Sequence, residues 1–214
     1  MTKSSAFIRM AVVLTLAAGT GARASAQDAG LNLIRDGATR DVVRSLLGGA
    51  LARGLPTGPL LSKALEGVAK KASTKSIREA MANLERRMRR ANDLLAPDPT
   101  VDELAMGADA LSVGVSEKTL KQMRAAAPKR SIALELGVLT ELVARNVPPG
   151  RAAKMILDLM ARGATGVQLT ALSNDVQRDV AAGLRPDVAL DLRGRGIMSL
   201  LPPSPSSVLT QPRK

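Results

Sequence analysis

Beyond its first 26 residues the chain has no aromatic side chain, because its one Phe is Phe7 and it contains neither Trp nor Tyr. A core must therefore be built from Leu, Val, Ile, Met and Ala. With 214 residues, of which 45% are hydrophobic, the chain is long enough to bury one. Small aliphatic side chains favour closely packed helices, and no segment shows the sustained alternation typical of strands. We expect an all-α fold of short amphipathic helices that form stacked αα-hairpins, either α-solenoid-like or as an irregular helical bundle.

The same composition excludes several chemistries. Without Cys the chain has no disulfide, no thiolate nucleophile and no Cys-based zinc site. Without His it lacks the usual general base near neutral pH and the commonest transition-metal ligand. Without aromatic rings it cannot stack on a nucleobase or a sugar. We therefore expect no cofactor, no metal and no nucleic-acid partner.

Residues 1–26 have the three parts of a secretory signal peptide. Lys3 and Arg9 form a positive start, the run Met10–Ala18 is apolar apart from one Thr, and Ala24-Ser25-Ala26 offers a cleavage pattern. The alternatives are an uncleaved anchor or a buried helix, but the run is shorter than the roughly 20 residues that span a bilayer. We expect Sec-type export with cleavage after Ala26, a periplasmic or secreted protein without a transmembrane span, and a net charge that falls from +12 to +9.

The remaining sequence is divided by Pro, Gly and capping residues into helical segments. The predicted helices span approximately residues 39–53, 59–71, 73–96, 100–113, 116–127, 131–143, 149–162, 165–182 and 186–193. Thr100 with Glu103, and Thr165 with Gln168, have the spacing of capping boxes. The predicted helical domain covers residues 27–200. Residues 201–214, rich in Pro and Ser, are predicted to be a disordered tail, either inert or engaging a partner.

Part of the sequence recurs at an offset of 92 residues. Residues 52–88 align without gaps with residues 144–180, and eight of the 37 pairs are identical, including Pro56 with Pro148 and Gly58 with Gly150. The alignment keeps the apolar stripes of two helices in phase. It predicts an internal repeat of αα-hairpins, which need stacked neighbours to bury both faces. Biased composition in an irregular bundle is the alternative.

Two pairs of carboxylates have a spacing that suits acid–base chemistry. Asp175 and Asp179, like Asp187 and Asp191, are four residues apart and share a helix face. Two such groups can catalyse hydrolysis or bind a hard cation. Neighbouring arginines can also neutralise them on a solvated helix face, which is the interpretation that we favour. We name no catalytic residue.

A cluster of four arginines marks the longest predicted helix, and we identify Arg86, Arg87, Arg89 and Arg90 as candidate residues for binding an anionic ligand. The alternative is structural: cations near the end of a helix complement its dipole, and Glu85 has the spacing to pair with Arg89.

Together these observations predict an exported, non-enzymatic helical interaction module. Its partner is a protein or an anionic envelope component such as anionic lipid or lipopolysaccharide. The alternative is an envelope hydrolase that uses carboxylate pairs alone. A continuous apolar or basic groove would favour the binding module, and a cleft with two converging desolvated carboxylates would favour the enzyme.

Overall fold

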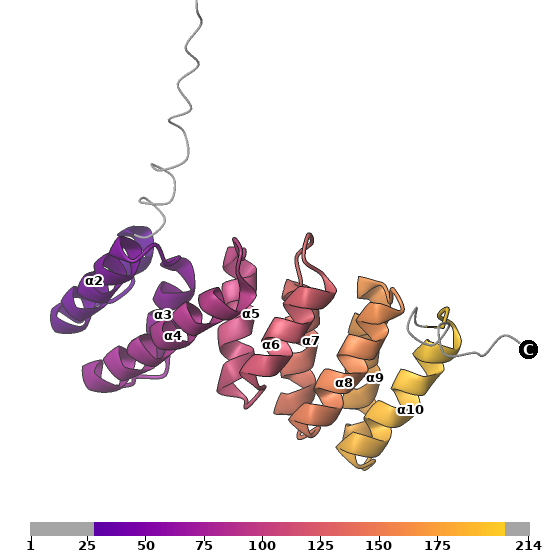
Figure 1. Ribbon diagram of the computed structural model, residues 1–214. Coiled ribbons are helices and arrows are strands. Elements are labelled where there is room, and N and C mark those ends of the chain that lie inside the picture. Colours follow the sequence, from indigo (N-terminus) through magenta and orange to yellow (C-terminus); the bar gives the residue numbers. More distant parts are fainter. Residues whose placement is uncertain (1–27, 204–214) are drawn as a thin grey trace, which may run out of the picture.

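The computed structural model describes residues 28–203, so the predicted signal peptide and residues 204–214 lie outside the described part. The fold is all-α, as predicted, and residues 28–203 contain no strand (Figure 1). A helical segment at residues 28–32 precedes the main series. The helices are α2 (Gly37–Ala52), α3 (Gly58–Ala69), α4 (Thr74–Leu95), α5 (Val101–Ser112), α6 (Glu117–Ala126), α7 (Ala133–Ala144), α8 (Pro149–Ala161), α9 (Gly166–Ala181) and α10 (Pro186–Ser199).

The predicted capping residues begin the helices as expected. The Ser73 side chain accepts a hydrogen bond from the N–H of Ser76 at the start of α4. Both capping boxes are present, one at Thr100 for α5 and one at Thr165 for α9. These bonds satisfy N–H groups that lack a partner within the helix, which explains why the sequence located these helix starts well.

The last helix is longer than predicted. It was expected to stop near Arg193, but α10 continues through Gly194 and Gly196 to Ser199. Gly194 is buried, and a Cβ atom there would lie 2.2 Å from the Met155 Cε atom of α8. This glycine therefore permits close packing between two helices rather than ending one of them.

The helices pack mostly on their neighbours in chain order and on the next helix but one. Helix α4 contacts α2, α3, α5 and α6. Beyond it, α5 contacts α7 and α7 contacts α9, while α6 contacts α8 and α8 contacts α10. Figure 1 shows the resulting row of helices, with α2 at one end and α10 at the other. Among the described residues, the apolar core side chains come from every helix and are all aliphatic or Met, while a few polar side chains such as Glu103 are also buried.

Six helix-to-helix turns have the same backbone geometry. Each ends its helix with a residue of positive φ, followed by a residue whose N–H bonds to a carbonyl five positions earlier. This pattern is the Schellman motif. The positive-φ residues are Gly54, Lys71, Gly114, Asn146, Gly163 and Gly183. Gly54 and Asn146 are 92 residues apart, and so are Lys71 and Gly163.

Within residues 28–203, no helix combines the length and the apolar character needed to cross a membrane.

Candidate anionic-ligand surface

Helix α4 positions the predicted arginines by burying its opposite face. Ile77, Met81, Leu84 and Met88 are at most 5% exposed, as their spacing of three and four residues predicts. Because 3.6 residues make one turn, side chains half a turn away from this stripe must face outward. Arg86, Arg89 and Arg90 are accordingly exposed.

The exposed arginines of α4 surround a hollow to which a fourth arginine contributes. Arg53, at the end of α2, lines this hollow together with Arg86, Arg89 and Arg90. Its other lining residues are Leu55, Asn92 and Asp93, so Asp93 is its one acidic lining residue. The fold therefore brings four guanidinium groups from two helices together around one open surface. Among the lining residues, the four arginines outnumber the single acidic residue.

The guanidinium groups in the hollow differ in their partners. Arg90 pairs with Glu117 of α6 through two hydrogen bonds, one of them 2.6 Å from Nε to Oε1. This pair lowers the pKa of Glu117 and raises that of Arg90, chiefly through its hydrogen bonds. Arg86 bonds to the side chain of Asn83, a neutral group. Arg89 forms no ion pair with another residue of the described part.

The predicted pair between Glu85 and Arg89 is wrong. Glu85 instead pairs with Arg53, whose Nη2 lies 2.7 Å from Oε1 of the carboxylate. Glu85 is only 8% exposed and lies toward α2, whereas Arg89 faces solvent. Sequence spacing allowed the local pair, but the packing of α2 on α4 determines the real one. As a result Arg89 keeps its charge available.

The helix dipole accounts for the cluster poorly. Helix α4 ends at Leu95, close to the predicted end, and its last turn contains no basic residue, so the four arginines lie more than a turn before the end of the helix. The stabilising effect of the dipole on a cation falls off within the last turn.

Arg87 lies apart from the other three arginines. It is half-buried, does not line the hollow, and its Nε atom is buried without a hydrogen-bond partner in the described part. Its charge acts on Asp109 of α5. Burial raises the pKa of Asp109, although Lys63 and Arg87 oppose that rise. The candidate surface therefore retains three of the four predicted residues.

The carboxylate pairs are held by arginines. Arg193 donates two hydrogen bonds to Asp179, of 2.6 and 2.7 Å, and Arg178 bonds to Asp175. On α10, Asp187 bonds to Arg185 and Asp191 lies 3.6 Å from Arg151. Hydrogen bonds from Arg193 hold the pKa of Asp179 below its usual value. A general acid needs the opposite shift, so this environment favours the structural interpretation of the pairs.

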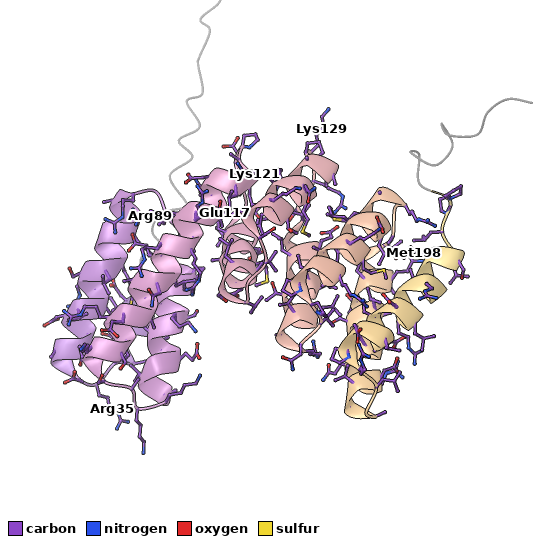
Figure 2. All side chains as sticks on the ribbon, turned by 60° about the horizontal axis from the view of Figure 1, so that its bottom comes forward. Arg35, Arg89, Glu117, Lys121, Lys129 and Met198 are labelled. Carbon is purple, nitrogen blue, oxygen red and sulfur yellow. The ribbon has the colours of Figure 1, made fainter. Side chains whose placement is uncertain are left out.

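Sequence reasoning missed three kinds of residue in this region. Arg53 and Glu117 are 32 and 27 residues from their partners, so no local spacing indicated them. Lys118 and Lys121 lie on α6, and no local spacing indicated that α6 packs beside α4. Figure 2 shows Arg89, Glu117 and Lys121 on the same side of the molecule.

No group of three or more acidic residues in the described part could hold a metal ion. Comparison of the chain with protein-family models, curated proteins and solved structures found no match in any of the three.

Proposed function

We propose that this chain is an exported helical module that binds phosphate-bearing anionic lipids, through Arg86, Arg89 and Arg90. The observation that carries the proposal is the hollow in which these three side chains meet Arg53. Guanidinium groups hold phosphate oxygens through paired hydrogen bonds. Several of them on one face give a surface that attracts anionic headgroups.

The local charge supports a lipid surface better than a deep ligand site. Glu85 neutralises Arg53 and Glu117 neutralises Arg90. The nearby Asp93 offsets one further charge, so the remaining excess positive charge rests on Arg86 and Arg89. These two side chains are exposed, so each contributes weakly and only at low ionic strength. A surface with many phosphates suits such a site, because several weak contacts add up.

Export is the second part of the proposal. The signal-peptide pattern of residues 1–26 supports export. A basic surface without aromatic stacking residues also suits an envelope component better than nucleic acid.

We also infer that the scaffold is a series of stacked αα-hairpins with an internal repeat. The positive-φ residues of two turns coincide at the offset of 92 residues, and so do the capping residues Ser73 and Thr165. The contacts of α2 with α4, and of each helix from α4 to α8 with the next helix but one, are those that such stacking requires.

The test of lipid binding is co-sedimentation with vesicles. Vesicles of phosphatidylcholine alone are compared with an equimolar mixture of phosphatidylcholine and phosphatidylglycerol, at low and high sodium chloride. We expect binding to the anionic vesicles only, and loss of that binding at high salt. Equal binding to both vesicles, or to neither, contradicts the proposal.

Two further arms separate the possible sources of the anion. At equal ionic strength, sodium phosphate should weaken vesicle binding no more than sodium chloride does. A stronger effect of phosphate would indicate a site for the free ion and contradict a lipid surface. Binding to an acidic polypeptide such as polyglutamate, with none to anionic vesicles, would contradict it in favour of a protein partner.

A further inference from the structure

A second hollow with basic lining residues lies on α6, beside the arginine hollow of α4. The exposed residues Lys118 and Lys121 line this second hollow, next to Glu117, and neither lysine forms an ion pair in the described part. Helices α4 and α6 are in contact, and the pair between Arg90 and Glu117 joins the two hollows. The cations on either side of that pair thus face one shared surface.

The Glu117 carboxylate binds the guanidinium of Arg90 in the same paired geometry that a phosphate group would use. Its two carboxylate oxygens accept from Nε and Nη2 of the same guanidinium. Both side chains of the pair are 48% exposed, so an incoming group can reach them. The pair joins positions 27 residues apart and so is not a local helix pair.

We propose that Glu117 is an internal competitor for the ligand phosphate at Arg90, and that its displacement joins Arg86, Arg89, Arg90, Lys118 and Lys121 into one cationic surface. This inference rests on the proposed function and adds both a regulating residue and two binding residues to it. A lipid phosphate that takes the place of the Glu117 carboxylate keeps the hydrogen bonds of Arg90. The phosphate also places its negative charge close to Arg86, Arg89, Lys118 and Lys121, which form no ion pair in the described part.

Removal of Glu117 should strengthen lipid binding, which the loss of a purely structural ion pair would not do. A pair that only stabilises the fold would leave lipid binding unchanged, or weaken it, when it is broken. If Glu117 competes with the ligand, its removal strengthens binding. Since a cation close to an anionic membrane contributes about a fivefold change in partition, Glu117→Gln should raise the partition coefficient on phosphatidylglycerol vesicles about fivefold, measured at about 0.1 M salt.

Two control variants separate this effect from simpler ones. Arg90→Gln breaks the same pair without releasing a cation and should not raise binding. Asp41→Asn, on α2, releases Arg44 from an exposed pair and changes the net charge by the same amount. Asp41 lies twelve residues before Arg53, about 18 Å along a helix, which exceeds the Debye length of about 10 Å at about 0.1 M salt, so its effect at that salt concentration should stay below about twofold.

The experiment measures the partition coefficients of the wild type and the three variants on the equimolar vesicles. Thermal unfolding by circular dichroism establishes that each variant is folded. An increase for Glu117→Gln alone supports the competitor. If the wild type binds but Glu117→Gln binds no more tightly than Asp41→Asn, the competitor is wrong and the proposed function stands. If neither wild type nor Glu117→Gln binds, both proposals are wrong.

Discussion

At the scale of single residues, the buried carboxylate of Glu103 ties together three helices. It is 2% exposed, and its Oε2 accepts from the N–H of Thr100 at 2.8 Å. Its Oε1 accepts from the N–H of Ile132 at 2.9 Å and from Arg124. One side chain therefore holds together the start of α5, the start of α7 and the guanidinium of Arg124 on α6.

Removal of this carboxylate should destabilise the fold strongly. Glu103→Ala leaves Arg124 buried without its charge partner and two N–H groups without an acceptor, which should cost about 3–5 kcal/mol in the free energy of unfolding. Urea denaturation measures this. Glu79→Ala, at an exposed position on α4, is the control and should change the value by less than about 0.5 kcal/mol. A cost for Glu103→Ala as small as that of the control would show that the network contributes nothing.

Glu103 should also make the free energy of unfolding depend on pH. Burial alone would raise the pKa of Glu103, but hydrogen bonds from Thr100, Ile132 and Arg124 outweigh it and lower the pKa from the ordinary 4.5. A lowered pKa in the folded state means that the contribution is complete above the ordinary value and disappears as the pH falls through the folded-state pKa. The stability difference between wild type and Glu103→Gln should therefore shrink between pH 6 and pH 3, each value approximate. A difference that stays constant over this range contradicts the assignment.

At the scale of elements, the turns between helices carry the most regular information in the chain. Lys71 and Gly163 occupy matched turns, with φ of 54° and 75°, but only glycine adopts this conformation without a steric cost. The identity of the residue at this position should therefore affect stability in opposite directions in the two turns.

Exchange of the residues tests this equivalence. Lys71→Gly should raise the free energy of unfolding by about 0.5–1 kcal/mol, because it relieves the left-handed conformation, and Gly163→Lys should lower it by about 1 kcal/mol. Urea denaturation of each single variant gives both values. A loss of stability in Lys71→Gly would show that the two turns are not equivalent.

The sequence predicted helices well where capping chemistry is local, and poorly where contacts are not. Ser73, Thr100 and Thr165 begin helices through bonds that span three residues, so their spacing alone indicates the element. The end of α10 was misplaced because Gly194 serves a contact with Met155, 39 positions earlier. The arginine cluster was predictable because its residues lie close together in the sequence. Glu117 and Arg53 were not predictable, because their partners are 27 and 32 residues away.

At the scale of the whole molecule, the proposed export predicts a defined N-terminus for the mature chain. Cleavage after Ala26 should leave Gln27 as the first residue of the mature chain. Intact-mass measurement and N-terminal sequencing of protein from the envelope fraction check this. Met1 retained on protein from that fraction would contradict cleavage, and protein confined to the cytoplasm would contradict export.

The central claim is that anionic lipid binds at one place and not through the general positive charge of the molecule. Two triple variants remove equal charge from different surfaces: Arg86/Arg89/Arg90→Gln on α4, and Arg178/Arg185/Arg195→Gln on exposed positions of α9, α10 and the turn between them. The measurement is the partition coefficient of each on phosphatidylglycerol vesicles at low salt.

The α4 variant should bind more than about tenfold more weakly than the wild type, since it removes three cations from the proposed surface, whereas the α9–α10 variant should lose less than about threefold. Equal loss in the two variants would show that binding follows net charge alone and would contradict the claim that the hollow beside α4 is the binding site.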